Sequence, residues 1–220
     1  MHGAIAASLM CADLLHLKRD IEEMEAAGIE YLHFDIMDGD FVPNFTLGFD
    51  LVKIVREATR IPVDVHLMIN RPELHIASID AGPGDIISVH AETTRQLQRA
   101  LDLVRAKGCK VGLAINPGTV LSTIEDLLPE IDMLLLMTVS PGFAGQKLIP
   151  YTIDKIAAAK KLITDRGLAV EIQVDGNVSY ENARKMRVAG ADIFVAGTSS
   201  VFMKDRTIAE GAGLLREAIL

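Results

Sequence analysis

Short apolar runs alternate with longer stretches of helical periodicity along the chain. The apolar runs predict eight β-strands, at residues 4–10, 31–37, 63–68, 86–91, 110–115, 133–139, 169–175 and 193–197. Several are almost continuously apolar, which is typical of parallel strands covered on both faces. The stretches that follow them predict helices at residues 14–27, 50–59, 72–81, 94–107, 123–128, 151–166, 180–189 and 207–220. The chain therefore predicts repeated strand–helix units.

Capping residues set the expected limits of several helices. We expect Asp13, Ser122 and Ser179 to cap the N-termini of helices 14–27, 123–128 and 180–189. Gly28 and Gly190 follow the ends of the first and last of these, where glycine commonly ends a helix.

Eight strand–helix units in 220 residues predict a (β/α)₈ barrel, the TIM-barrel architecture of the α/β class, as one catalytic domain over residues 1–220. The alternative is an open doubly wound sheet. Such sheets usually have fewer strands, and no G-x-G-x-x-G or Walker loop follows any predicted strand. In a barrel, the active-site groups are expected at the carboxyl ends of the strands and in the loops after them.

Three predicted strands carry polar side chains on a face that a barrel would bury. Because side chains alternate along a strand, three sets each share a face: His33, Asp35 and Met37; Asp64, His66 and Met68; Glu171, Gln173 and Asp175. Buried ionisable groups are costly unless they are paired or bind a metal. Imidazole and carboxylate suit a divalent transition metal, so we expect His33, Asp35, His66 and Asp175 to bind one ion. The pattern does not distinguish Zn²⁺, Mn²⁺, Fe²⁺ and Co²⁺.

Other polar positions are assigned lesser roles. His90 ends the fourth predicted strand and either supports the metal ligands or serves the core. His2, His16 and His75 are expected to face solvent. Asp38 lies on the strand face opposite Asp35, so it is expected to serve the loop that follows.

Glycines follow three predicted strands in a region where barrels often hold phosphate. They lie in Ser140-Pro141-Gly142-Phe143-Ala144-Gly145-Gln146, Gly176-Asn177 and Gly197-Thr198-Ser199. Glycine lets the backbone approach an anion closely and offer its N–H groups. These three loops predict a phosphate site, and the first is also a candidate lid.

Composition narrows the function classes. Half of the residues are hydrophobic, enough for a large core, and the net charge of −8 argues against a nucleic-acid surface. No apolar run is long enough for a membrane helix, and Cys11 and Cys109 have no metal-type spacing. We expect a cytoplasmic protein with reduced thiols and a small-molecule partner; homo-oligomerisation stays open.

Six motifs together resemble the ribulose-phosphate 3-epimerase family along essentially the whole chain. They are Ser8-Leu9-Met10; His33-Phe34-Asp35-Ile36-Met37-Asp38-Gly39 continuing to Phe41-Val42-Pro43-Asn44; Asp64-Val65-His66-Leu67-Met68; Pro141-Gly142-Phe143-Ala144-Gly145-Gln146; Val174-Asp175-Gly176; and Val195-Ala196-Gly197-Thr198. The resemblance implies a metal-dependent isomerase that interconverts D-ribulose 5-phosphate and D-xylulose 5-phosphate.

The resemblance also implies roles for individual residues. The metal ligands would be His33, Asp35, His66 and Asp175, and the two aspartates would also be the acid–base pair. The substrate would contact Ser8, His66, Met37, Met68 and Met137, and its phosphate end would contact Gly142, Phe143, Ala144, Gly145, Gly176, Asn177, Gly197 and Thr198.

Some positions depart from the commonest family pattern. Ala144 and Asn177 each replace a usual glycine, and residues 198–200 differ from the usual run. Residues 8–14 and 137–139 look more like the related D-allulose 6-phosphate 3-epimerases. The metal ligands and the acid–base pair are unaffected, so the choice between a pentulose and a hexulose phosphate stays open.

Epimerisation at C3 removes a proton from one face of the sugar and returns one to the other, through an enediolate. Asp35 and Asp175, on strands at opposite sides of the predicted barrel, suit this two-base transfer if one is protonated while the other is ionised. Two alternatives use the same residues. Metal-assisted hydrolysis would activate water, and a non-catalytic sensor would only bind a sugar phosphate.

Overall fold

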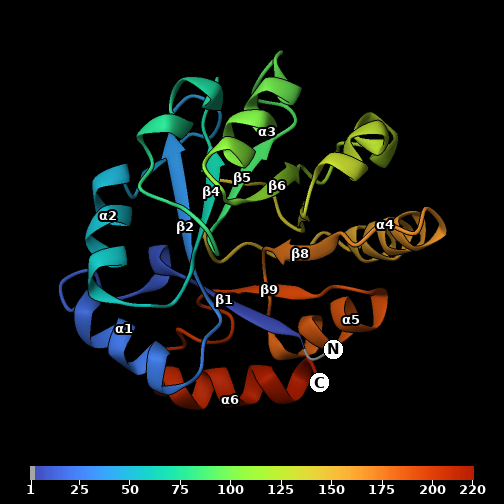
Figure 1. The fold of residues 1–220 in the computed structure, drawn as a ribbon. Coiled ribbons are helices and arrows are strands. Elements are labelled where there is room, and N and C mark those ends of the chain that lie inside the picture. Colours follow the sequence, from blue (N-terminus) through green and yellow to red (C-terminus); the bar gives the residue numbers. More distant parts are fainter. Residues whose placement is uncertain (1–2) are drawn as a thin grey trace.

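The computed structural model describes residues 3–220, in which nine strands form one sheet (Figure 1). The strands are β1 (Ala4–Ser8), β2 (Tyr31–Asp38), β3 (Phe45–Thr46), β4 (Val63–Met68), β5 (Ile86–His90), β6 (Lys110–Ile115), β7 (Met133–Met137), β8 (Glu171–Asp175) and β9 (Ile193–Ala196). Their order is β1-β9-β8-β7-β6-β5-β4-β2-β3, and a further pairing of β1 with β2 closes the sheet. All pairings are parallel except that of β3, which adds two residues antiparallel to β2. The predicted barrel and its eight strands are confirmed, whereas β3 was not predicted.

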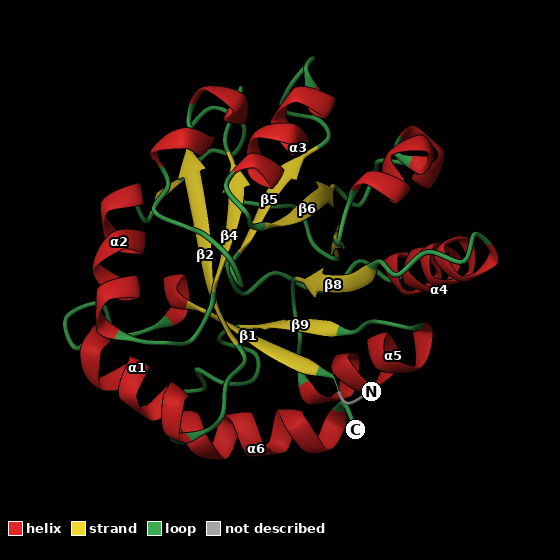
Figure 2. Cartoon of the chain, in the orientation of Figure 1, coloured by secondary structure: helices red, strands yellow, loops and turns green. Residues whose placement is uncertain are grey.

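Helices surround the closed sheet (Figure 2). They are α1 (Leu17–Ala26), α2 (Phe49–Ala58), α3 (Leu97–Ala106), α4 (Thr152–Asp165), α5 (Tyr180–Ala189) and α6 (Ile208–Ala218). Side chains on one face of each strand, such as Phe34 and Leu67, are fully buried against the helices in the larger apolar core. Burying one side chain of this size stabilises the fold by about 1.5–3 kcal/mol. The alternate face lines the barrel interior, where Ala6, Leu135 and Ile193 belong to a second apolar cluster.

The helix ends confirm one predicted cap and correct two others. Ser179 accepts a hydrogen bond from the backbone N–H of Asn182 at 3.2 Å, and Gly190 ends α5 with a left-handed backbone, as predicted. Asp13 does not cap the first helix, which begins at Leu17 rather than residue 14. The Asp13 carboxylate instead accepts from the backbone N–H of Leu15 and lies 2.7 Å from a ring nitrogen of His16, so it stabilises a turn before the helix.

Two predicted α-helices are short 3₁₀ turns instead. Residues 72–81 form the turns Pro72–Leu74 and Ile76–Ser78, which are separated at His75. Ser122 lies inside the turn Leu121–Thr123 rather than capping a helix, and Glu125–Glu130 is also 3₁₀. Pro129 lies within that last turn, where its missing N–H disfavours an α-helix. Within residues 3–220, no helix has both the length and the apolar character needed to cross a membrane.

Candidate metal and substrate site

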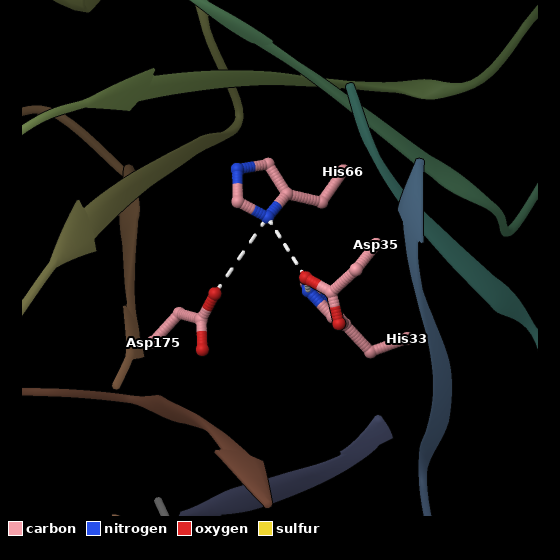
Figure 3. Close-up of side chains that lie close together, drawn as sticks. All are labelled: His33, Asp35, His66 and Asp175. Atoms are coloured by element: carbon pink, nitrogen blue, oxygen red, sulfur yellow. Dashed lines mark ion pairs between the residues drawn. The ribbon is translucent and has the colours of Figure 1, made fainter. Parts of the chain in front are cut away.

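The four predicted ligands converge at the carboxyl end of the barrel. On the paired strands β2 and β4, Asp35 lies opposite His66. Asp175 is the last residue of β8. Around the barrel, β9 and β1 lie between β8 and β2. Figure 3 shows these side chains, with His33, pointing toward one shared region. One nitrogen or oxygen atom from each residue lies within 4.8 Å of the other three, so the structure brings together the predicted set as a group that could hold a metal ion.

Unpaired nitrogens face this region. His33 Nε2 lies 3.3 Å from Asp35 Oδ1, and His66 Nδ1 lies 3.4 Å from the same oxygen and 3.6 Å from Asp175 Oδ2. Both histidines are fully buried, yet neither of these nitrogens has a hydrogen-bond partner. An unsatisfied buried polar atom costs about 1–3 kcal/mol, a cost that a bound cation would offset. The donor set therefore fits a divalent transition metal ion.

The other ring nitrogen of His33 is held from behind. His33 Nδ1 lies 2.6 Å from Asp64 Oδ2, and Gln173 Nε2 donates to the same oxygen at 2.5 Å. When the ring is neutral and Nδ1 donates to the buried carboxylate, the lone pair of Nε2 points to the shared region. A carboxylate behind a ligating histidine is a common support for metal sites.

The two aspartates have opposite protonation tendencies. Burial and, after it, the negative charge of Asp35 together raise the pKa of Asp175 to about 7. Burial would also raise the pKa of Asp35, but His33 and His66 outweigh it and lower that pKa well below its usual range. At neutral pH, Asp35 is therefore ionised while Asp175 can hold a proton. This is the asymmetry that an acid–base pair needs.

The pKa values of the two histidines also differ. Burial lowers the pKa of His66. Burial acts in the same direction on His33, but Asp64 and Asp35 raise the pKa of His33 well above its usual value. A cation bound to His33 Nε2 would therefore compete with a proton for that nitrogen.

A pocket lined in part by Asp35 and Asp175 opens at this end of the barrel. All of the predicted substrate contacts except His66 line it: Ser8, Met37, Met68, Met137, Gly142, Phe143, Ala144, Gly145, Gly176, Asn177, Gly197 and Thr198. His66 is fully buried beside Asp35 and Asp175 and is not among the lining residues. Ser8 has a second contact, because its hydroxyl donates to Asp35 Oδ2 at 2.6 Å. The structure thus brings the three predicted glycine loops to one pocket.

Hydrogen bonds hold these loops in place. The side-chain amide of Asn177 donates to the carbonyl of Gln146 at 2.7 Å, which joins the loop after β8 to the loop after β7. Asn44 similarly donates to the carbonyl of Gly142 at 2.8 Å. Gly176 has a φ of 118°, and a Cβ there would lie 2.8 Å from the backbone nitrogen of Val139. Glycine is therefore required where these two loops meet.

Asp38 and the histidines outside the predicted ligand set lie in different surroundings. Asp38 accepts hydrogen bonds from the backbone N–H groups of Asp40, Phe41 and Asn70, so its predicted loop role is confirmed. His16 and His75 are exposed, as predicted, and His2 lies outside the described residues. His90 is fully buried, with its Nε2 lying 2.8 Å from His66 Nε2.

Sequence reasoning missed several residues at this site. Met10, Cys11, Val139 and Val178 line the pocket without a predicted contact, whereas Ser140, Gln146 and Ser199 belong to the loops predicted to hold phosphate. Glu92, whose carboxylate lies 3.1 Å from His90, was not singled out. The His90-x-Glu92 spacing at a strand end is the one sequence signal that could have drawn attention to it.

A family model described as the ribulose-phosphate 3 epimerase family matches residues 4–202. A ribulose-phosphate 3-epimerase of Bacillus subtilis is 40% identical over 203 residues, covering 92% of this chain and 94% of that protein. One of Escherichia coli is 39% identical over 196 residues, covering 89% of this chain and 87% of that protein. A chloroplastic ribulose-5-phosphate-3-epimerase of Arabidopsis thaliana is 39% identical over 203 residues, covering 91% of this chain and 72% of that protein.

Solved structures resemble the chain in fold at much lower identity. A 3-keto-L-gulonate-6-phosphate decarboxylase from Vibrio cholerae aligns with a TM-score of 0.73 and 13% identity, over 100% of this chain and 98% of that one. An orotidine 5'-phosphate decarboxylase from Pyrococcus horikoshii gives a TM-score of 0.69 at 15% identity, over 98% of each chain. At such identities these neighbours support the barrel fold alone.

Proposed function

The chain belongs to the ribulose-phosphate 3-epimerase family, and from this premise we propose that it interconverts D-ribulose 5-phosphate and D-xylulose 5-phosphate by proton transfer at C3. The observation that carries the proposal is the pair Asp35 and Asp175. The two carboxylates reach one pocket from well separated strands and have opposite protonation tendencies. A protein that only binds a sugar phosphate has no need of such a pair.

We assign His33, Asp35, His66 and Asp175 as ligands of one divalent ion, for which Zn²⁺, Mn²⁺, Fe²⁺ and Co²⁺ are all compatible. The unpaired nitrogens His33 Nε2 and His66 Nδ1 support this assignment. When bound, the ion supplies positive charge that stabilises the negative charge developing on the substrate oxygens at C2 and C3.

The proposed proton transfer uses the two carboxylates in turn. In one direction, Asp35 removes the C3 proton as a base, and protonated Asp175 returns a proton to the opposite face of C3. In the other direction their roles reverse. The Ser8 hydroxyl, which donates to Asp35 Oδ2, holds that carboxylate in position.

Other pocket residues bind and shield the sugar in this proposal. Met37, Met68 and Met137 form an apolar wall beside the two aspartates, which keeps water from competing for the proton. The backbone around Gly142, Gly145, Gly176, Asn177, Gly197 and Thr198 binds the phosphate.

The pocket residues near positions 8–14 and 137–139 favour a second candidate, epimerisation of D-allulose 6-phosphate, because these segments look like those of that related group. A side-by-side rate comparison on D-ribulose 5-phosphate and D-allulose 6-phosphate tests the choice, with metal content measured on the same sample. We expect a larger kcat/KM on the pentulose phosphate. A larger kcat/KM on the hexulose phosphate would replace the first candidate with the second, and turnover of neither would contradict both.

A further inference from the structure

A chain of hydrogen-bonding groups leads from the metal-facing histidine His66 to the outside of the barrel. His66 Nε2, the nitrogen that faces away from the aspartates, lies 2.8 Å from His90 Nε2. His90 Nδ1 lies 3.1 Å from Glu92 Oε2. Both rings are fully buried, and they stack with their centroids 5.0 Å apart. The proposed proton transfer by Asp35 and Asp175 uses neither His90 nor Glu92.

At the Glu92 end of this series of hydrogen bonds, the donor and acceptor roles are fixed. The other oxygen of Glu92, Oε1, accepts a hydrogen bond from the backbone N–H of Asn116 at 2.8 Å and one from the hydroxyl of Thr119. The Lys155 ammonium, on α4, donates to the carbonyls of Asn116 at 3.2 Å and Thr119 at 2.7 Å, which holds that turn against the barrel. Glu92 is therefore an anchored acceptor with one oxygen left for His90.

The positions of the hydrogens follow from these contacts. A carboxylate only accepts, so His90 must carry its hydrogen on Nδ1 and donate to Glu92. A neutral His90 ring then presents the lone pair of Nε2 to His66. The only arrangement that makes the 2.8 Å contact a hydrogen bond places the hydrogen of His66 on Nε2. The lone pair of His66 is left on Nδ1, the unpaired atom beside Asp35 and Asp175.

We propose that Glu92 and His90 are positioning residues that fix His66 in the tautomer able to bind the metal ion through Nδ1. The inference rests on the proposed metal site. It makes His66 the counterpart of His33, whose metal-facing nitrogen is set by direct contact with a buried carboxylate. For His66 the carboxylate acts through a second ring, so a residue outside the pocket lining controls a ligand inside the barrel.

The substitution Glu92→Gln exchanges the donor and acceptor roles between residue 92 and His90 Nδ1, with almost no change in side-chain shape. The fixed N–H of Asn116 still needs an acceptor, so the amide oxygen takes that side and the NH₂ group turns to His90 Nδ1. His90 must then accept at Nδ1 and carry its hydrogen on Nε2. That hydrogen points at His66 Nε2, which favours the His66 tautomer with a hydrogen on Nδ1, where the metal should bind.

The matched control is Thr119→Val, which removes one hydrogen bond to the same carboxylate and leaves the polarity unchanged. The probe is Zn²⁺, with its dissociation constant measured by competition with a chromophoric chelator. We expect Glu92→Gln to weaken Zn²⁺ binding by about 10- to 100-fold. Thr119→Val should change it by less than about threefold, because only one neutral hydrogen bond is lost. Equal affinities of the two variants would overturn the proposal.

A second readout needs no variant. Long-range ¹H–¹⁵N spectra of the Zn²⁺-loaded wild-type protein report which nitrogen of each histidine carries hydrogen. We expect hydrogen on Nδ1 of His90 and on Nε2 of His66. Hydrogen on Nε2 of His90 would contradict the proposed role of Glu92 and His90 without contradicting the metal site. A wild-type protein that takes up no Zn²⁺, Mn²⁺, Fe²⁺ or Co²⁺ would instead contradict the proposed metal site, and with it the role of Glu92 and His90.

Discussion

The two ends of the barrel interior both carry ionisable side chains, but they differ in whether the polar atoms of these side chains have hydrogen-bond partners. At the amino end, Tyr31, Lys110 and Glu171 begin strands β2, β6 and β8. Lys110 Nζ lies 3.0 Å from a Glu171 oxygen and 3.4 Å from the Tyr31 hydroxyl. At the carboxyl end, the nitrogens of His33 and His66 that face the aspartates have no hydrogen-bond partner.

Strands β2 and β8 carry members of both groups, so the difference lies in hydrogen bonding and burial rather than in the scaffold. The Lys110–Glu171 pair is partly exposed and satisfied by itself, as expected for a polar plug that separates the core from water. The carboxyl-end cluster is buried and incomplete. In a barrel interior, an incomplete buried cluster is the feature that indicates ligand binding, whereas ionisable residues alone do not.

The largest expected effect comes from the carboxylates of the carboxyl end. We expect Asp35→Asn and Asp175→Asn each to reduce turnover of D-ribulose 5-phosphate by roughly 100- to 10,000-fold, because each removes an acid–base group. A coupled assay measures the rate, and circular dichroism checks the fold. The control at the other end is Glu171→Gln, which should stay near the wild-type rate. An Asn variant that keeps more than a few per cent of that rate would refute the two-base assignment.

Metal removal should have the next largest effect. Treatment with a strong chelator should reduce activity by at least about 100-fold, because charge stabilisation by the ion contributes several kcal/mol. Activity should return when one of the four candidate ions is added back. Elemental analysis of each sample is the check, and full activity in a verified metal-free protein would contradict the metal role.

The support behind His33 should have a smaller effect. Asp64→Asn, with its amide oxygen in the place of Oδ2, keeps the acceptor for both His33 Nδ1 and Gln173 Nε2. The loss of charge should weaken Zn²⁺ binding by about 10-fold. Chelator competition measures this, and an unchanged dissociation constant would show that Asp64 serves only the core.

The smallest effect is expected at the amino end. Lys110→Met removes a partly exposed ion pair and keeps an apolar stem, so the free energy of unfolding should change by no more than about 1 kcal/mol. Chemical denaturation measures this change, and the epimerase rate should not move. A large loss of activity in this variant would remove the distinction between the two ends.

The elements of the fold could be predicted where they depend on residues close together in the sequence. Strand 63–68, in which Asp64 and His66 alternate with apolar residues, was predicted with the limits that the structure has. Ser179 also caps its helix as predicted, because the contact lies within a few residues. Asp13 was misassigned because a neighbouring residue, His16, competes for its carboxylate. The 3₁₀ turns at Pro72–Leu74 and Glu125–Glu130 lie in segments whose periodicity alone resembles that of a helix.

The site was predictable to the extent that it lies on strands. Alternation placed His33, Asp35 and His66 on interior faces, and parallel pairing then brought them to one end. Glu92 lies just beyond its strand, in a loop whose conformation depends on the turn at residues 116–119 and on Lys155 of α4. No local pattern reports such a contact, so only the structure connects Glu92 to His66.

Solvent isotope exchange tests the central claim most directly. The metal-loaded protein is incubated with D-ribulose 5-phosphate in D₂O, and the D-xylulose 5-phosphate formed is analysed by NMR. Transfer by two carboxylates predicts deuterium at C3 of the product, because the returned proton comes from an acid in exchange with solvent. Product that forms at the normal rate with hydrogen retained at C3 would contradict the account.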